Sequence, residues 1–306
     1  MLKELTRHTY QVFMPDGTSM NVKDELQSRT QACEFLESGG VIYFPESPFS
    51  RSAEDAEFLL HQNQKDASYH KNIAYRPKED RITGAKNYSE QDTARLRSIL
   101  RNFSQQSEEL VNTFLSPYAG GYHKDFASYR PIEERGRKLR LRARNDLIHV
   151  DSFPTRPTMG DRIFRVFENV NPNQVRVWRC SDTFEVLARQ FRKQRPAPGN
   201  MDKPGKTLLP QFLMRSLGLK LSSGSPYDSW MNGFHNFLKE NEEFQDLCRK
   251  NVMEFPPGCA WMVYTDMVSH SVLSGQFALE QTFIIAKKNM VLPDKAPINI
   301  LRQLYT

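Results

Sequence analysis

The sequence lacks the features of an exported or membrane-spanning protein. It contains no run of about 18 or more apolar residues, and its first segment, MLKELTRHTYQVFMPDG, has no apolar core of a secretory signal. Cysteine is scarce as well, and Cys33, Cys180, Cys248 and Cys259 form no CxxC pair. Their spacing argues against a disulfide framework or a zinc knuckle and suits a reducing compartment. We therefore expect a globular protein of the cytoplasm.

Several catalytic and binding motifs are also absent from the sequence. There is no glycine-rich phosphate loop, GxSxG turn or paired Cys/His nucleophile, which argues against P-loop NTPases, α/β-hydrolases and cysteine proteases. No RNP, KH or helix-turn-helix motif is present, so we expect no nucleic-acid partner. The charge balance, 42 Lys and Arg against 36 Asp and Glu, is nevertheless +6 and suits an acidic ligand or an anionic surface.

Helical patterns come first along the chain, and strand patterns follow. Between residues 51 and 117, apolar side chains recur every three or four positions and predict supporting helices. From residue 118, short β-branched and aromatic runs predict roughly six to eight strands, the clearest being RIFRVFENVNP, QVRVWRC, AWMVYTD and ALEQTFIIAKK. Amphipathic spacing returns over 205–252 and predicts helices inserted in the β-core.

This order of patterns predicts one α+β domain over residues 1–306. Mixed helices and strands over 1–117 would support the core. The core itself would comprise 118–195 and 253–290. A loop and then helices would be inserted between its two halves, at 196–252.

The candidate chemistry centres on His149 and Asp151. They occupy alternate positions at the end of a predicted strand, so the imidazole and the carboxylate share one face and can bind one metal. A histidine from a distant strand would complete a triad of two histidines and one carboxylate. Such a triad leaves coordination positions open and suits non-haem Fe(II) oxygenases. Alone, His-x-Asp is a common pair and equally fits a surface contact.

His270 is the candidate for the third ligand. It follows the predicted strand AWMVYTD and precedes a turn at Gly275 and another predicted strand. This order of strand, histidine, turn and strand is how a double-stranded β-helix, the jelly-roll of cupin-like proteins, presents its distal histidine. We therefore expect a double-stranded β-helix core. The alternative for His270 is a hydrogen-bonded histidine of the core.

These segments resemble the Fe(II)/2-oxoglutarate-dependent dioxygenases, and in particular the bacterial Kdo 3-hydroxylases. The strings IHVDSFPTRPTMGDRIFRVFENVNP, QVRVW and VSHSVLSGQFALEQTF carry the likeness, with GGVIYFPESPF near the start and YDSWMNGFHNFLKENEEFQ in the insertion. That family hydroxylates 3-deoxy-D-manno-oct-2-ulosonic acid (Kdo) in the lipopolysaccharide inner core. The resemblance implies that His149, Asp151 and His270 bind Fe(II), with 2-oxoglutarate and O2 as cosubstrates.

The cation that pairs with the far carboxylate of 2-oxoglutarate has no single candidate. Many members place an Arg or Lys shortly after the distal histidine, but here no cation follows His270 before Lys287. The strand after His-x-Asp offers Arg162 and Arg165, which face opposite sides of a regular strand. Because a carboxylate favours a bidentate guanidinium, both are candidates, with Thr282 as a hydroxyl donor. A surface salt bridge is the alternative for either arginine.

A basic run precedes the expected iron site. Between Arg130 and Arg144, seven cations are opposed by two glutamates. In KLRLRAR the cations alternate with apolar residues, which predicts a strand with Lys138, Arg140, Arg142 and Arg144 on one face. With Arg130, this face could hold the carboxylates of Kdo and the phosphates of lipid A, or contact an anionic membrane surface. A solvated strand face is the alternative.

The leading hypothesis is a hydroxylase that adds a hydroxyl to C3 of Kdo on lipid A, at the cytosolic face of the inner membrane. It would convert Kdo-lipid A to Ko-lipid A. One alternative keeps the chemistry and changes the substrate to a protein side chain or a small metabolite. Another is a non-catalytic cupin-like protein whose basic strand holds an anionic polymer or a membrane.

Overall fold

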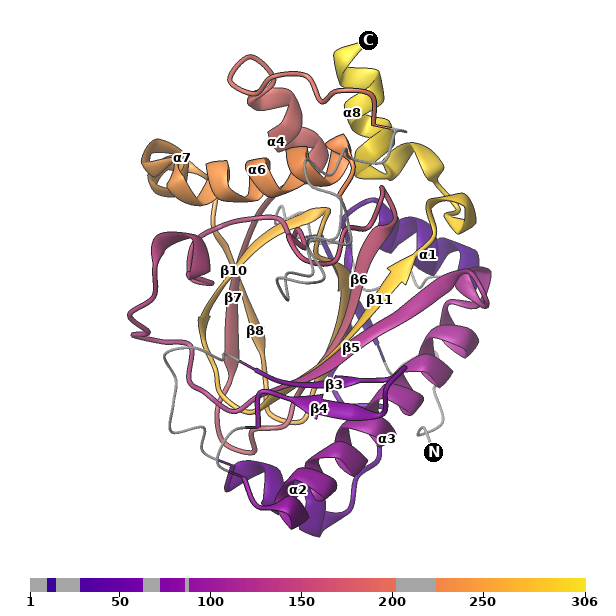
Figure 1. The fold of residues 1–306 in the computed structure, drawn as a ribbon, viewed down its shortest axis with the longest axis vertical. Helices are drawn as coiled ribbons and strands as arrows, with labels where there is room; N and C mark the ends of the chain where they lie inside the picture. Colours follow the sequence, from indigo (N-terminus) through magenta and orange to yellow (C-terminus); the bar gives the residue numbers. More distant parts are fainter. Residues whose placement is uncertain (1–9, 15–27, 63–71, 86–87, 202–223) are drawn as a thin grey trace, which may run out of the picture.

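The structure is a computed structural model of the chain. It describes residues 10–14, 28–62, 72–85, 88–201 and 224–306. Within these ranges, the chain forms a mixed α and β architecture around two antiparallel sheets (Figure 1). Seven strands follow residue 118, within the predicted six to eight, and four more precede it in the described ranges.

Eight strands of the described chain pair in the larger sheet. Their spatial order is β1-β2-β9-β6-β11-β5-β3-β4, and all neighbours are antiparallel. Their bounds, in that order, are Gln11–Phe13, Val41–Phe44, Ala260–Tyr264, Arg162–Asn169, Ala278–Ile285, Tyr122–Arg130, Ile73–Arg76 and Arg81–Thr83. The smaller sheet has the order β10-β7-β8, with bounds Val268–Ser274, Arg176–Thr183 and Asn251–Phe255. The predicted strands RIFRVFENVNP, QVRVWRC, AWMVYTD and ALEQTFIIAKK are confirmed as β6, β7, β9 and β11.

Helices cover the outside of the larger sheet and one end of the fold (Figure 1). The N-terminal helices are α1 (Arg29–Glu37), α2 (Ala53–Leu60) and α3 (Glu90–Phe114). The later helices, grouped at the upper end in Figure 1, are α4 (Phe184–Gln190), α6 (Pro226–Glu240), α7 (Glu242–Leu247) and α8 (Pro297–Tyr305). The side chain of Ser89 caps α3 by accepting from the amide of Asp92, and the apolar face of α3 enters the core. The predicted helices over 51–117 are thereby confirmed.

The predicted helical insertion is present in the part that the structure describes. α6 begins with a capping box, in which Ser225 accepts from the amide of Asp228 and the Asp228 carboxylate accepts from the amide of Ser225. α7 follows directly. The helix predicted from TLLPQFLMRSLGL lies within 202–223, outside the described residues.

The two faces of the larger sheet bury different side chains. Phe164 of β6 joins the cluster beneath the helices, whereas Phe167 packs with Trp178 and Trp261 between the two sheets. The ring centroid of Phe167 lies 5.0 Å from that of Trp261 and 5.1 Å from that of Trp178. Because alternate residues of a strand share a face, Arg165 points the same way as Phe167, into the space between the sheets.

The prediction of a strand for KLRLRAR is wrong. The segment is a loop that contains one 3-10 turn, η2 (Leu141–Ala143). Leu141 is 45% exposed, so the alternating apolar residues have no buried face that would hold a strand in place. Arg142 pairs with Glu240 of α6, Nε to Oε1 2.5 Å, while Arg144 pairs within the loop. The cations therefore do not form a single basic face.

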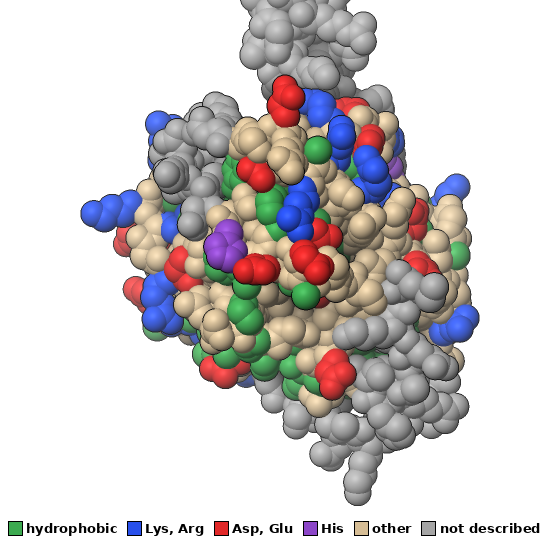
Figure 2. All heavy atoms as spheres, turned by 90° about the horizontal axis from the view of Figure 1, so that it is seen from below, with side chains coloured by type: hydrophobic (Ala, Val, Ile, Leu, Met, Phe, Trp, Pro, Cys, Tyr) green, Lys and Arg blue, Asp and Glu red, His purple; other side chains and the backbone are tan. Residues whose placement is uncertain are grey.

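Charges of both signs are interspersed on the face of the molecule drawn in Figure 2. Arg95 of α3 pairs with Asp55 of α2, and Arg101 of α3 pairs with Asp80 of the turn between β3 and β4. Such exposed pairs contribute little stability. Among the described helices, none combines the length and the apolar composition that crossing a bilayer requires.

A buried ion pair anchors β6 to the turn between β9 and β10. Arg162 is fully buried and donates from Nε to Asp266 Oδ2 at 2.9 Å and from Nη2 to Asp266 Oδ1 at 3.1 Å. We expect Arg162→Met to lower the free energy of unfolding by about 3–5 kcal/mol, because the Asp266 carboxylate is left buried without its partner. Urea denaturation measures this loss, and a loss below about 1 kcal/mol, the value of an exposed pair, would contradict it.

Candidate active site

Three ligating side chains converge between the sheets. The ligating atoms of His149, Asp151 and His270 all lie within 4.8 Å of one another, and His149 Nε2 lies 3.7 Å from Asp151 Oδ1. All three residues are at most 9% exposed. Two imidazoles and one carboxylate at this spacing form a donor set for a divalent transition metal, and Fe(II) oxygenases use this set.

The backbone brings the two histidines together. His149 and His270 form an isolated antiparallel bridge, in which the His149 amide donates to the His270 carbonyl at 3.0 Å and the His270 amide donates back at 2.8 Å. His270 lies on β10, whereas His149 follows the loop that contains η2. The amide of Asp151 donates to the carbonyl of Thr265, the residue after β9. These backbone bonds hold the three candidate ligands next to one another.

Both candidate histidines are oriented by backbone carbonyls. The Nδ1 atom of His149 lies 2.7 Å from the carbonyl of Leu147, and that of His270 lies 2.9 Å from the carbonyl of Val268. A carbonyl can only accept, so Nδ1 carries the proton and donates. The Nε2 lone pair of each ring is therefore free to bind a metal, which is the usual arrangement behind a metal-binding histidine.

Burial and neighbouring charges keep the three groups ready to bind a metal. Burial lowers the pKa of His149 and of His270, so both rings are neutral at neutral pH. Burial alone would raise the pKa of Asp151, but the Arg165 guanidinium holds it well below its usual range. Two neutral imidazoles and an ionised carboxylate are the protonation states that metal ligands need.

The lowered histidine pKa values predict a pH dependence for the metal-free protein. An unfolded histidine has a pKa of about 6.5. Below that pH, His149 and His270 bind protons in the unfolded chain but resist protonation in the native protein. The free energy of unfolding should therefore fall as the pH is lowered from about 7 to 5.5. Urea unfolding in the presence of a chelator measures this, and a free energy of unfolding that stays constant or rises over the interval would contradict the prediction.

A cavity of about 160 Å³ lies beside the triad. Its lining residues are Asn72, Arg130, Asn145, His149, Asp151, Arg165, Phe167, Arg176, Trp178, His270 and Val272. Three guanidinium groups thus face one carboxylate, which makes the cavity suitable for an acidic molecule. A larger hollow of about 600 Å³ lies between α3 and the segment 50–55, but the ligating triad is not part of its lining.

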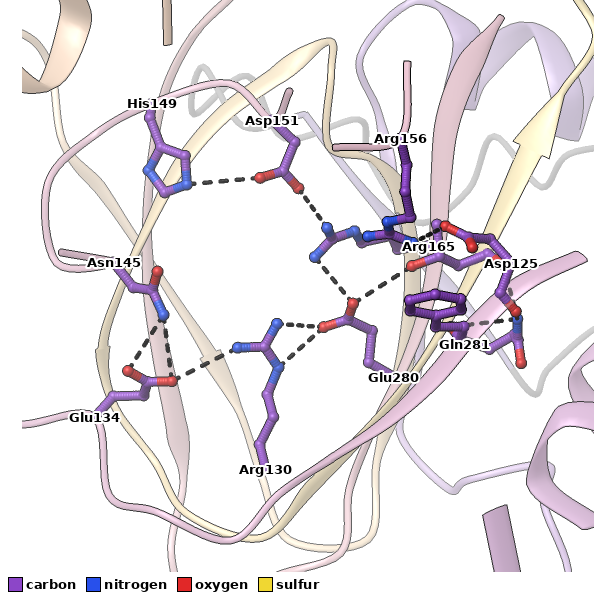
Figure 3. A network of polar contacts seen from close by, with 12 residues as sticks. Asp125, Arg130, Glu134, Asn145, His149, Asp151, Arg156, Arg165, Glu280 and Gln281 are labelled. Carbon is purple, nitrogen blue, oxygen red and sulfur yellow. Dashed lines mark hydrogen bonds and ion pairs between the residues drawn. The ribbon is translucent and has the colours of Figure 1, made fainter. Parts of the chain in front are cut away.

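The arginines belong to one buried polar network (Figure 3). Arg165 joins Asp151 to Glu280, with Nη2 3.2 Å from Asp151 Oδ2 and Nη1 3.0 Å from Glu280 Oε1. Arg130 donates from Nε to Glu280 Oε2 at 2.9 Å and lies 3.6 Å from Glu134. The network therefore connects a candidate metal ligand to two guanidinium groups on the cavity wall.

Arg176 completes the basic side of the cavity. It is 1% exposed, its Nη1 donates to the carbonyl of Gly275 at 3.1 Å, and its Nη2 lies 3.8 Å from Glu134. Burial and Arg130 lower the pKa of Arg176 to about 10, so it is still a cation at neutral pH. Gly275 has φ +126°, and a Cβ there would lie 2.7 Å from Arg176 Cγ, so glycine permits this close approach.

Aromatic rings pack against both candidate histidines. Trp178 stacks on His270 with centroids 5.0 Å apart and planes 20° apart. His235 of α6 meets His149 edge-on at 4.8 Å, and its Nδ1 lies 2.7 Å from the carbonyl of Val150. His235 therefore packs directly beside the triad.

The structure separates the two arginines that the sequence left as alternatives. Arg165 lines the cavity, whereas Arg162 is on the opposite side of β6 in its pair with Asp266. Thr282 is buried opposite Arg165 in the register and donates to Glu280 Oε1 at 3.4 Å. Arg130 lines the cavity at the end of β5.

The remaining predicted cations lie on the loop and not in the cavity lining. Arg140 and Arg142 are exposed, and Arg144 is half-buried beside Asp146. Sequence reasoning did not find Glu280, Arg176 or Glu134. A buried acidic residue inside an apolar strand, as in ALEQTFII, is the signal that could have identified Glu280.

Proteins of known structure share this fold. The family model for 3-deoxy-D-manno-oct-2-ulosonic acid (Kdo) hydroxylase matches residues 19–306. Crystal structures of the Kdo hydroxylase KdoO, a non-heme Fe(II) α-ketoglutarate (2-oxoglutarate) dependent dioxygenase, are similar to this chain. Its complex with α-ketoglutarate and Fe(III) is 30% identical over 90% of each chain, with a TM-score of 0.78. Its cobalt(II) complex is 31% identical over 90% of each chain, with a TM-score of 0.79.

A search of curated protein sequences gave no match. The family model covers nearly the whole chain and includes His149, Asp151 and His270. The chain belongs to the Kdo hydroxylase family.

Proposed function

We propose that this chain is an Fe(II)- and 2-oxoglutarate-dependent hydroxylase that adds a hydroxyl to C3 of Kdo on lipid A. The observation that carries the proposal is the buried His149, Asp151 and His270 triad beside a cavity with three guanidinium groups. KdoO, a similar protein of known structure, is a Kdo hydroxylase and forms complexes with α-ketoglutarate, with succinate and with iron.

The donor set fits iron. His149 and His270 would each bind through Nε2, because their Nδ1 atoms donate to carbonyls. Asp151 would bind through its carboxylate, whose Oδ1 lies 3.7 Å from His149 Nε2 and whose Oδ2 is paired with Arg165. When bound, iron with 2-oxoglutarate and O2 supplies the oxidising chemistry and yields succinate and CO2.

The guanidinium groups of the cavity would bind 2-oxoglutarate. A dicarboxylate in a buried site requires cationic partners, and Arg130, Arg165 and Arg176 are less than 12% exposed at their side chains. Trp178 would close one wall, since it stacks on His270 and lines the cavity. In this account, the chain orients the cosubstrate and excludes water, while Thr282 acts on the site only through its bond to Glu280.

We propose that the two sheets form a double-stranded β-helix within one domain over 1–306. In support, the sheets enclose a shared core of Phe167, Trp178 and Trp261, and the triad draws on both halves of the chain. Helices α6 and α7 then form the insertion that covers one end of this core (Figure 1).

The loop that contains η2 is the proposed contact for the acidic substrate. It connects Arg130 of the cavity to His149, and it exposes Arg140 and Arg142 beside the apolar Leu141. Cations beside an apolar side chain fit a phosphorylated lipid at a membrane surface. We therefore propose peripheral contact with the cytosolic face of the inner membrane.

Removing the two exposed cations tests the substrate contact. Arg140→Ala with Arg142→Ala should raise the KM for Kdo-lipid A by about tenfold at low salt and by less at high salt, because exposed charges are screened. The KM for 2-oxoglutarate should stay unchanged. An unchanged KM for Kdo-lipid A at low salt would contradict this role for the loop.

Release of succinate tests the proposed activity. Purified protein with Fe(II), 2-oxoglutarate and O2 should form succinate faster with Kdo-lipid A than without it. Stimulation by a protein or a small metabolite instead would favour the first alternative substrate class. A chain that forms no succinate, needs no metal and binds anionic vesicles in a salt-sensitive way would be the non-catalytic binding protein.

A further inference from the structure

Glu280 lies behind the wall of the candidate cosubstrate cavity. Its carboxylate bridges the two guanidinium groups that point into the cavity: Oε2 accepts from Arg130 Nε at 2.9 Å, and Oε1 lies 3.0 Å from Arg165 Nη1 (Figure 3). Glu280 is 4% exposed, and the cavity lining includes both arginines but not Glu280 itself. The buried Glu280 carboxylate therefore engages N–H groups that Arg130 and Arg165 could otherwise donate to a ligand in the cavity.

The Glu280 carboxylate also changes the balance of charge around the cavity. The lining carries Arg130, Arg165 and Arg176 against Asp151 alone. Glu280 adds a negative charge directly behind two of these cations, in surroundings where burial strengthens electrostatic interactions. Any dianion that enters the cavity is attracted by the guanidinium groups and repelled by Glu280.

We propose that Glu280 is a positioning residue that holds Arg130 and Arg165 toward the cavity and competes with the distal carboxylate of 2-oxoglutarate for them. This inference rests on the proposed function, since it takes 2-oxoglutarate as the cosubstrate. Succinate also has two carboxylates and meets the same competition. Glu280 thereby limits the affinity for both molecules and speeds the release of the product.

The substitution Glu280→Gln tests the effect of the negative charge while it leaves the shape of the side chain nearly unchanged. Glutamine has nearly the same shape and keeps Oε1 as an acceptor for one guanidinium group, but it removes the negative charge. Protein loaded with Co(II) should therefore bind 2-oxoglutarate and succinate about tenfold more tightly in this variant, by the Coulomb energy of one charge at close range. In turnover, the KM for 2-oxoglutarate and kcat should both fall, because succinate leaves more slowly.

The matched control is Glu168→Gln. Glu168 is also a buried glutamate of the larger sheet, 3% exposed, and it pairs with Arg51 outside the cavity lining. This variant should lose stability without binding 2-oxoglutarate more tightly. Pyruvate, a 2-oxo acid without a distal carboxylate, should bind to wild type and to Glu280→Gln with equal affinity.

Calorimetric titration of the Co(II)-loaded protein without O2 decides the inference. Affinity for 2-oxoglutarate that is unchanged or weaker in Glu280→Gln would overturn it. If that variant does not fold, Glu280→Asp replaces it: the shorter carboxylate cannot bridge both guanidinium groups, so binding should tighten by a few-fold, and unchanged or weaker binding would overturn the inference. Wild-type protein that fails to bind 2-oxoglutarate would overturn the proposed function, and this inference with it.

Discussion

Replacing His270 or Asp151 by alanine is expected to abolish metal-dependent turnover and to weaken Fe(II) or Co(II) binding by more than about a hundredfold. Substitution of partners behind a metal ligand already costs 10–100-fold in affinity or activity, and loss of a ligand removes a coordination bond itself. Each variant leaves two of the three donors that lie within 4.8 Å of one another. Calorimetric titration with Co(II) measures the affinity directly, independent of activity.

The matched control for this prediction is His61→Ala. His61 is exposed at the end of α2, where its Nδ1 contacts the carbonyl of Glu57. This variant should bind Co(II) as the wild type does. Retention of tight metal binding by folded His270→Ala and Asp151→Ala proteins would contradict the proposed iron site.

Replacing Arg165 by methionine is expected to raise the Kd for 2-oxoglutarate by about a hundredfold or more. A buried ionic hydrogen bond that loses one partner costs several kcal/mol, and Arg165 lines the cavity and pairs with the candidate ligand Asp151. Methionine keeps much of the side-chain volume and loses all the hydrogen-bond donors. Titration of 2-oxoglutarate into Co(II)-loaded protein measures the change.

Arg162→Met is the matched control for Arg165→Met. Both arginines lie on β6 and both are buried in ion pairs, but only Arg165 faces the cavity. Arg162→Met should lower the stability and leave the affinity of the folded protein for 2-oxoglutarate nearly unchanged. The account is contradicted if Arg162→Met, rather than Arg165→Met, loses that affinity selectively.

Sequence patterns predicted the strands of the core because those strands are made of β-branched and aromatic residues. β6, β7, β9 and β11 are of this kind: β6, β9 and β11 of the larger sheet are buried on both faces, and β7 of the smaller sheet buries Trp178 between the sheets. β5 was missed because its sequence, YHKDFASYR, is rich in polar residues. In the structure it is held by its pairing with β11 and β3, and a single sequence does not reveal such tertiary support.

For KLRLRAR the error is the opposite one: a strand was predicted, but the segment is a loop. Alternating cations and apolar residues fit a half-buried strand, but a strand also needs a partner and a buried face. Here Leu141 is exposed, and pairing with β10 is formed at the His149 bridge instead. The local pattern was present without the tertiary contact that would have made it a strand.

The candidate metal triad could be predicted because its ligands have characteristic types and strand contexts. The surrounding electrostatics could not be predicted, because the partners are remote in sequence. Arg130 and Glu280 are 150 residues apart, and periodicity alone did not decide which of Arg162 and Arg165 points inward. The packing of Phe167 against Trp261 decides it, since that contact determines which face of β6 lies between the sheets.

The most direct measurement of the central claim is turnover of Kdo-lipid A under isotopically labelled O2. The protein is incubated with Fe(II) and 2-oxoglutarate, and mass spectrometry follows the lipid product and succinate together. The account predicts one labelled oxygen atom in a new hydroxyl on C3 of Kdo, one in succinate, and equal amounts of the two products. Kdo-lipid A that stays unmodified while a different substrate acquires the label, or a product without label, would contradict it.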